Sequence, residues 1–361
     1  MISVLVVDDS VVVRRLIVDA LGGHPDIHVV GTAANGRIAL AKIELLRPDV
    51  VTLDIEMPEL DGLGTLRELR RTRRMPPVIM FSTLSVAGAT ATLEALAAGA
   101  TDFVTKPSNT GSFAASRRMV EEQLIPKILS LGGKRPPPMA LAAAPPAVPR
   151  HPVRPPARTG RIAAITIASS TGGPDALAKV LAALPATLPV PVLCVQHMPP
   201  VFTKMFAERL DRTCAVHVVE AEDGMPVTAG TVYIAPGDRH LTLVGRAAAV
   251  STRLTQAPPE NSCRPAADVL FRSVAEMYGG NTLVVVLTGM GQDGKRGCES
   301  LRAAGAEVIA QDQATSVVWG MPGAVVGAGL ADAVLPLAEI GGYLTTRLAT
   351  PVAAQPKVVF S

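Results

Sequence analysis

Short, continuous runs of apolar residues alternate with helical patterns along most of this chain. Such runs, bounded by turn residues, are typical of buried strands in parallel sheets. In the first part of the chain the expected strands are Val4–Val7, Val29–Gly31, Val50–Leu53, Val78–Phe81 and Asp102–Thr105. The expected helices are Val11–Leu21, Gly36–Leu46, Gly62–Arg71 and Ala87–Ala98. This alternation predicts an α/β fold with a doubly wound open sheet, which binds ligands at the carboxyl ends of its strands.

The second part of the chain alternates in the same way. Its expected strands are Ile162–Ala168, Val192–Gln196, Thr231–Ala235, Leu283–Leu287 and Glu307–Ala310. Its expected helices are Pro174–Ala183, Phe202–Leu210, Ala266–Tyr278 and Lys295–Ala304. The turn residues Pro236–Arg239 predict a hairpin that joins Thr231–Ala235 to His240–Val244. We therefore expect a mostly parallel, doubly wound α/β domain with a small antiparallel insert.

A segment rich in proline and alanine separates the two parts. Residues 136–156 include Pro136–Pro138, Pro145–Pro146 and Pro155–Pro156. Such a composition cannot bury a core and favours an extended, semi-rigid spacer. The predicted organisation is a first domain at 1–125, a linker at 126–160 and a second domain at 161–346.

Composition narrows the class of protein. The chain has 361 residues and a net charge of +3, with a basic excess confined to the linker region, so the charge does not indicate a nucleic-acid partner. We find no secretory signal and no run apolar enough to cross a membrane. The four cysteines are widely spaced and form no CxxC pair, which favours a reduced, cytoplasmic protein.

Polar side chains follow several strands of the first domain. Asp8 and Asp9 end the first strand and Asp54 ends the third, so three carboxylates should meet at the sheet's switch point. Crowded carboxylates repel one another, and their hard oxygen atoms suit Mg²⁺. Lys106 and Ser82 end two further strands and add an ammonium group and a hydroxyl. Together these groups indicate a site at which a carboxylate receives a phosphoryl group.

This pattern resembles a response-regulator receiver domain with a doubly wound (βα)5 fold, and the resemblance covers residues 1–125. It implies that Asp54 is the phosphoacceptor and that Asp8, Asp9 and Asp54 hold Mg²⁺. It also implies switch roles for Ser82, Phe103 and Lys106. Thr83 lies next to Ser82 and is an alternative for the switch hydroxyl.

Ser170-Thr171-Gly172-Gly173 follows the first strand of the second domain, and Pro174 then opens a helix. A hydroxyl at such a turn lies beside the free N–H groups of the helix start, as a nucleophile beside an oxyanion pocket does. An ordinary helix cap explains the same residues. A base and an orienting carboxylate are available, since His197 and Asp293 follow two other strands.

The run Gly289-x-Gly291-x-x-Gly294, with Asp312 further along, also fits a dinucleotide-binding fingerprint. That alternative leaves the Ser170 and His197 motifs without a role. We find no local spacing of His, Cys and Asp that supports a zinc site.

Residues 161–346 resemble the catalytic domain of the chemotaxis protein-glutamate methylesterase (CheB) family. The resemblance rests on the motifs beginning at Ser170, Gln196, Tyr233, Ser262, Leu287 and Gln311. It implies that Ser170 is the nucleophile, His197 the base and Asp293 the orienting acid. Main-chain donors at Thr171, Gly172, Gly173 and Met290 are the oxyanion candidates. The family usually has glycine where this chain has Ala168.

The resemblance implies hydrolysis of glutamate γ-methyl esters, and deamidation of glutamines, on chemoreceptors. The expected partners are methyl-accepting chemoreceptors as substrate and a chemotaxis histidine kinase as phosphoryl donor, with no nucleic acid and no membrane insertion. The resemblance also implies that Mg²⁺ serves the receiver domain and that the esterase needs no cofactor. The alternative is a phospho-switch whose second domain only binds its partner; such a module has no need of Ser170, His197 and Asp293 together.

Overall fold

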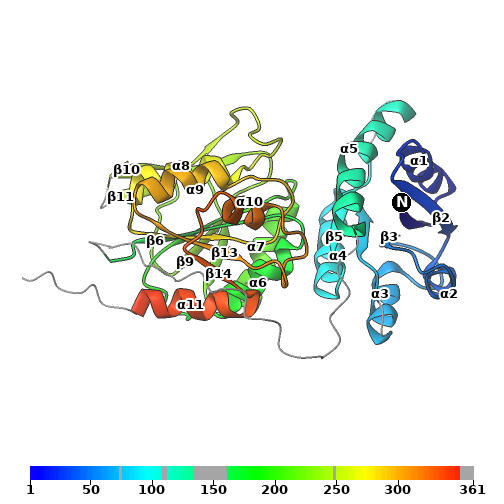
Figure 1. The fold of residues 1–361 in the computed structure, drawn as a ribbon, viewed down its shortest axis with the longest axis horizontal. Helices are drawn as coiled ribbons and strands as arrows, with labels where there is room; N and C mark the ends of the chain where they lie inside the picture. Colours follow the sequence, from blue (N-terminus) through cyan, green and yellow to red (C-terminus); the bar gives the residue numbers. More distant parts are fainter. Residues whose placement is uncertain (73–74, 108–111, 134–160, 247–248, 350–361) are drawn as a thin grey trace, which may run out of the picture. The chain divides into compact units, whose positions relative to one another are not determined.

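The computed structural model describes residues 1–72, 75–107, 112–133, 161–246 and 249–349. The chain divides into two compact units, Met1–Val148 and Pro149–Ser361 (Figure 1). Most of the expected linker, residues 134–160, lies outside the described residues, and the domain limits of 1–125, 126–160 and 161–346 stay a prediction.

The first unit is a five-stranded parallel sheet with the strand order β2-β1-β3-β4-β5. The strands are β1 (Ile2–Val7), β2 (Ile27–Ala33), β3 (Val50–Asp54), β4 (Val78–Ser82) and β5 (Asp102–Thr105). The helices are α1 (Val11–Leu21), α2 (Gly36–Leu46), α3 (Gly62–Arg71), α4 (Val86–Ala97) and α5 (Phe113–Gly132). Helices α1 and α5 pack together, as do α2, α3 and α4, and the predicted doubly wound sheet is confirmed.

Local sequence explains where these helices begin. Each is preceded by a residue whose side chain accepts a hydrogen bond from a backbone N–H three residues further on. These capping residues are Ser10, Asn35, Asp61, Ser85 and Ser112. Helix α5 continues to Gly132 because Leu124 and Ile128 are buried against the sheet, so residues 126–132 are helical rather than extended.

The second unit contains a seven-stranded parallel sheet with the order β14-β13-β12-β6-β7-β9-β8. Its strands are β6 (Ala164–Ser169), β7 (Val192–Gln196), β8 (His217–Glu220), β9 (Thr231–Ile234), β12 (Thr282–Val286), β13 (Glu307–Gln311) and β14 (Ala333–Leu335). Its helices are α6 (Gly173–Ala182), α7 (Phe202–Thr213), α8 (Ala267–Tyr278), α9 (Lys295–Ala303), α10 (Met321–Gly327) and α11 (Leu337–Ala349). Helices α8, α9 and α10 lie over one face of the sheet, and α6 and α11 lie over the other (Figure 1).

The predicted hairpin between Thr231–Ala235 and His240–Val244 is wrong. Strand β9 lies between β7 and β8, so both of its edges already have parallel partners. Strand β10 (His240–Arg246) pairs instead with β11 (Ala249–Thr255) as a separate antiparallel ribbon. Its buried Leu241 and Leu243 belong to the same apolar cluster as residues of α8. The expected antiparallel insert exists, but its partner strand is β11.

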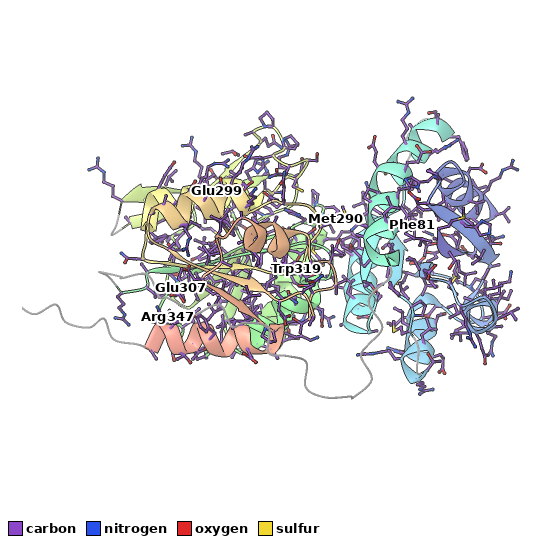
Figure 2. All side chains as sticks on the ribbon, in the orientation of Figure 1. Phe81, Met290, Glu299, Glu307, Trp319 and Arg347 are labelled. Carbon is purple, nitrogen blue, oxygen red and sulfur yellow. The ribbon has the colours of Figure 1, made fainter. Side chains whose placement is uncertain are left out.

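Buried charge attaches α11 to the sheet. Glu307, at the start of β13, has no exposed surface. Arg347 of α11 donates two hydrogen bonds to the Glu307 Oε2 atom, at 2.8 and 3.1 Å, and the Tyr343 hydroxyl donates to Oε1 at 2.5 Å. The Arg347 and Glu307 side chains form an ion pair on the face of the sheet that α11 covers (Figure 2). This contact joins residues 40 positions apart, and no local pattern predicts it.

Candidate phosphorylation and active sites

In the first unit, charged groups meet where strands β1, β3 and β5 end. The Lys106 Nζ atom lies 2.7 Å from Asp54 Oδ2 and 3.0 Å from Asp8 Oδ2. Asp9 completes a group of three carboxylates, one oxygen atom of each lying within 4.8 Å of the others. Strands β1 and β3 are neighbours although α1, β2 and α2 separate them in the chain, so this is the switch point of the sheet.

Electrostatics make this pocket fit a cation. Burial raises the pKa of Asp54 to about 6; Asp8 acts in the same direction and Lys106 opposes it. The polar neighbour of the buried Asp8 Oδ2 atom is the Lys106 ammonium group, at 3.0 Å. Three neighbouring carboxylates, two of them buried, form a suitable ligand set for Mg²⁺. The residues present therefore fit the ion that receiver domains use.

The two remaining switch candidates lie on β4 and β5. The Ser82 hydroxyl lines the same pocket as Asp54 and Lys106, and it accepts a hydrogen bond from Thr92 at 2.7 Å. Thr83 also lines this pocket but is exposed. Phe103 is largely buried within β5.

In the second unit, the serine and the histidine follow adjacent strands. Ser169 of β6 is in register with Gln196 of β7, so Ser170 and His197 are the residues that directly follow these two adjacent strands. The Gln196 side chain joins them, because its Nε2 atom donates to the carbonyl oxygens of Ser170, at 3.0 Å, and His197, at 3.2 Å. Ser169 donates to the Oε1 atom of Gln196 at 2.6 Å. The sheet therefore brings the two sequence-predicted residues together.

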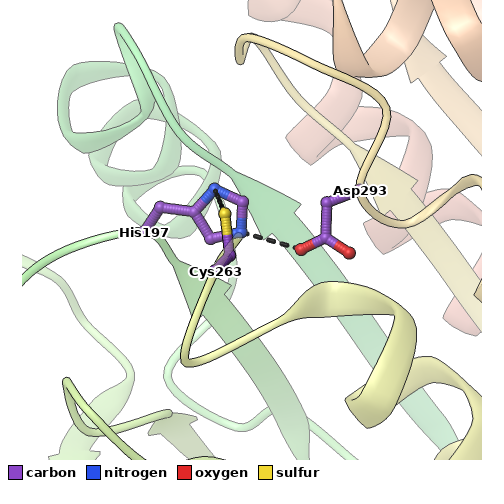
Figure 3. A group of neighbouring side chains, drawn as sticks. All are labelled: His197, Cys263 and Asp293. Atoms are coloured by element: carbon purple, nitrogen blue, oxygen red, sulfur yellow. Dashed lines mark hydrogen bonds and ion pairs between the residues drawn. The ribbon is translucent and has the colours of Figure 1, made fainter. Parts of the chain in front are cut away.

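Asp293 reaches the histidine from the other side of β6. It follows β12, which pairs with β6 on the edge opposite β7. The His197 Nε2 atom lies 2.8 Å from Asp293 Oδ2 (Figure 3). Because the carboxylate can only accept, Nε2 carries the proton and Nδ1 is the basic nitrogen when the ring is neutral. No hydrogen bond joins the Ser170 hydroxyl to His197 in the described part of the chain, and such bonds are often long in the resting state of hydrolases.

Backbone donors hold Asp293 ionised. Its carboxylate accepts hydrogen bonds from the N–H groups of Ala267, at 2.6 Å, Asp268, at 3.0 Å, and Gly294, at 3.0 Å. Burial raises the pKa of Asp293, but His197 and these donors lower it by more. Burial lowers the pKa of His197, but the hydrogen bond to Asp293 and the nearby Cys263 raise it by more. The arrangement thus stabilises an imidazolium, as the base of an acyl-transfer reaction requires.

Sequence reasoning missed two residues of this cluster. The Cys263 Sγ atom lies 3.6 Å from His197 Nδ1 (Figure 3), and the Asn261 amide donates to Asp293 Oδ1 and Asp268 Oδ2, both at 2.9 Å. Cys263 and His197 are 66 positions apart. The only available signal was that His197 and Cys263 lie in two of the motifs shared with the family. That signal does not show that the two side chains are close in space.

The oxyanion candidates differ in availability. Gly172 has φ of +75° and places the chain at the start of α6, where an added Cβ would lie 2.6 Å from Val317. The Gly173 N–H donates to the Ser170 carbonyl oxygen at 2.7 Å and is therefore engaged, which does not support Gly173 as a donor. Among the described residues, the N–H groups of Gly172 and Met290 have no acceptor. An added Cβ on Gly289 would lie 2.9 Å from the Ser170 Cβ atom, so the Met290 segment passes close to Ser170.

The fold and the two sites define a response regulator whose output domain is an enzyme. A model of the response regulator receiver domain matches residues 4–116, and a model of the CheB methylesterase family matches residues 165–344. The chain is 57% identical over 353 residues, 96% of both chains, to a protein-glutamate methylesterase/protein-glutamine glutaminase of Nocardioides sp.. It is 48% identical to a protein of that name from Trichodesmium erythraeum, over 96% of this chain and 98% of the relative.

Among solved structures, the CheB methylesterase catalytic domain of Thermotoga maritima is similar, with 46% identity and a TM-score of 0.50. The match covers 51% of this chain and 97% of that domain. The chain belongs to the CheB methylesterase family. Within the described residues, no helix is long and apolar enough to span a membrane.

Proposed function

We propose that the protein hydrolyses γ-methyl esters of glutamate residues on chemoreceptors and deamidates receptor glutamines, under control of phosphorylation at Asp54. The observation that carries the esterase assignment is the His197–Asp293 hydrogen bond of 2.8 Å. His197 directly follows β7, and Ser170 directly follows the neighbouring strand β6. Relatives over nearly the full length are named for these two activities, which supports the substrate class.

The proposed reaction is a two-step acyl transfer. His197 Nδ1 takes the proton of the Ser170 hydroxyl while Ser170 Oγ attacks the ester carbonyl. The N–H groups of Gly172 and Met290 are the proposed donors for the oxyanion, because they have no acceptor among the described residues and are therefore available. The imidazolium returns the proton to the leaving methoxide, and methanol departs. Water, activated by the same nitrogen, then releases the glutamate side chain and Ser170.

Phosphorylation is proposed to occur on the Asp54 carboxylate. Asp8, Asp9 and Asp54 would hold Mg²⁺, which when bound neutralises charge on the phosphoryl oxygens. Lys106 already contacts both Asp8 and Asp54, so it would follow any change in their charge. Ser82 lines the same pocket, and its hydroxyl would donate a hydrogen bond to a phosphoryl oxygen. A chemotaxis histidine kinase is the proposed donor.

A purely binding role for the second domain is the competing function. It would leave the hydrogen-bonded pair of His197 and Asp293, and Ser170 at the end of the neighbouring strand, without a chemical role. Methanol release from methylated receptor membranes, measured with and without acetyl phosphate, tests the proposal. An absence of methanol release under both conditions would favour the binding role.

Replacing Asp54 by asparagine is expected to prevent phosphorylation and to leave the esterase at its basal rate. Asparagine keeps the shape of the side chain but removes the nucleophilic oxygen charge. Intact-mass measurement after treatment with acetyl phosphate should show no added phosphoryl group, and methanol release should not respond to the phosphodonor. Asp26→Asn, at an exposed carboxylate outside this cluster, is the control and should behave as wild type. An Asp54→Asn variant that still responds places the acceptor elsewhere.

Removing residues 1–158 is expected to raise the basal esterase rate and to abolish the response to phosphodonors. The proline-rich spacer tethers the receiver at a high effective concentration without packing it into the second domain's core. Phosphorylation then needs to shift a docking equilibrium by only a few kcal/mol, on the order of a hundredfold. The truncated chain is compared with the unphosphorylated full chain in methanol release, after circular dichroism has verified folding. A folded but equally slow domain shows that the receiver does not inhibit.

A further inference from the structure

His197 presents one ring nitrogen that Asp293 does not bind, and a thiol faces it. The Sγ atom of Cys263 lies 3.6 Å from Nδ1, while Nε2 is 2.8 Å from Asp293 Oδ2 (Figure 3). The thiol therefore faces the nitrogen that the proposed reaction assigns to the Ser170 proton. No bond forms or breaks at Cys263 in the proposed esterase reaction.

These distances also fit a tetrahedral metal ion. Zinc binds imidazole nitrogen at about 2.0–2.1 Å and thiolate sulfur at about 2.3 Å. At a tetrahedral angle, these bond lengths separate the two ligand atoms by about 3.6 Å. The separation in the structure is 3.6 Å. A cation could thus enter between Nδ1 and Sγ with little movement of either side chain.

Asp293 supplies the outer partner that such a site needs. A histidine that ligates a metal usually donates its other N–H to a carboxylate, which fixes the tautomer and makes the ligating nitrogen more basic. Here the Nε2–H group donates to Asp293, whose position is in turn held by the N–H groups of Ala267 and Asp268. The arrangement that makes Nδ1 a base therefore also makes it a metal ligand.

A tight turn fixes the backbone at Cys263. Glu260 and Cys263 exchange two backbone hydrogen bonds, of 3.1 and 2.9 Å, and the intervening Asn261 and Ser262 both have positive φ, of 52° and 62°. Positive φ at both central positions is the geometry of a tight type I′ turn. Cys263 is therefore the last residue of this turn, and its backbone N–H and C=O groups form the hydrogen bonds that close it.

Two side-chain contacts anchor this turn to the domain. Arg272 of α8 donates to both carboxylate oxygens of Glu260, at 2.9 and 2.6 Å. The Asn261 amide bridges Asp268 and Asp293. A preorganised ligand loses little conformational entropy when a metal binds.

The site is also open to an ion from solution. The side chain of His197 is 13% exposed and Cys263 is only partly buried. By contrast, Cys194 and Cys298 are fully buried, and burial raises the pKa of both thiols. Of these cysteines only Cys263 combines access with an adjacent imidazole. Soft sulfur and imidazole donors select zinc and similar ions over Mg²⁺.

We propose that His197 Nδ1 and Cys263 Sγ form a binding site for Zn²⁺, and that the bound ion inhibits the esterase. Binding releases the thiol proton to solvent, forms the N–Zn and S–Zn bonds and leaves the remaining positions to water. The metal then occupies the lone pair that must receive the Ser170 proton. The inhibitory effect, although not the binding, rests on the proposed esterase function.

Binding is tested without substrate, with Co²⁺ as the spectroscopic probe for Zn²⁺. The full chain is kept in excess Mg²⁺, so that the carboxylates of the receiver domain are occupied. A thiolate-to-cobalt charge-transfer band is expected in wild type and should disappear on addition of Zn²⁺. The band should be absent in Cys263→Ala and His197→Gln, and present in the matched control Cys214→Ala. No band in wild type, or an equal band in folded Cys263→Ala, overturns the site.

Inhibition is tested separately by methanol release. Zn²⁺ alone should inhibit wild type and Cys214→Ala reversibly, with recovery on adding a chelator. In Cys263→Ala the inhibition constant should rise at least about tenfold, since metal sites commonly lose this much when a supporting group is removed. Equal inhibition of Cys263→Ala refutes the inhibitory role of this site. A metal-free wild type that releases no methanol contradicts the esterase function instead, and the cobalt band still decides the metal site.

Discussion

Replacing Ser170 by alanine is expected to lower kcat for ester hydrolysis by at least about 10⁴-fold, because the loss of a triad nucleophile removes the acyl-enzyme route. The Ser170 hydroxyl has no hydrogen-bond partner among the described residues, and the side chain is only partly buried. Stability should therefore change by no more than about 0.5 kcal/mol. Methanol release gives the rate, and thermal unfolding gives the stability.

Ser169→Ala is the matched control for this experiment. Its hydroxyl is buried and donates to Gln196, so alanine should cost about 1 kcal/mol of stability while reducing the rate far less than the change at Ser170. An alanine at position 170 that keeps activity within about tenfold of wild type contradicts the nucleophile assignment. A large rate loss in both variants would show that either change disturbs the local structure at the end of β6, rather than that Ser170 is the nucleophile.

Replacing Asp293 by asparagine is expected to lower kcat by about 10³–10⁴-fold. The amide cannot stabilise the imidazolium as the carboxylate does. The contact with Asp293 raises the pKa of His197, so its loss lowers that pKa. Because the base acts when neutral, the acidic limb of the kcat/KM profile should move to lower pH in the variant. Methanol release is measured across pH for both proteins.

Asp268→Asn is the control for Asp293→Asn. Asp268 is also buried and also accepts from Asn261, but its other partner is the Gly297 N–H rather than His197. Its replacement should cost stability and leave the position of the acidic limb unchanged. If the acidic limb of the kcat/KM profile does not move in Asp293→Asn, or moves equally in both variants, Asp293 does not raise the pKa of His197 as proposed.

The local sequence predicted most of the elements that carry the sites. The apolar runs ending at Asp54, Ser169 and Gln196 are continuous, and in a parallel sheet such runs can hardly be anything but buried strands. The short elements β8, β14 and α10 were not predicted, since few residues give a weak pattern. No range was predicted for β11 or for the longer helices α5 and α11, whose Pro126 and Gly341-Gly342 weaken the helical pattern. The segment before β10 was misjudged because a turn motif shows that a chain bends, but not which strand it then pairs with.

Local pattern alone predicts that both domains are doubly wound α/β units, and it places the site residues at strand ends: Asp54 ends one strand, and Asp8, Ser170, His197 and Asp293 follow others. Periodicity and turn chemistry are local properties, and a residue just after a parallel strand must lie at the carboxyl edge of the sheet. Which strands are neighbours became known from the folded structure, whose strand order brings Asp293 to Nε2 of His197; Cys263 contacts Nδ1 of the same ring. These contacts depend on packing between segments distant in the chain, for which the local pattern carries no information.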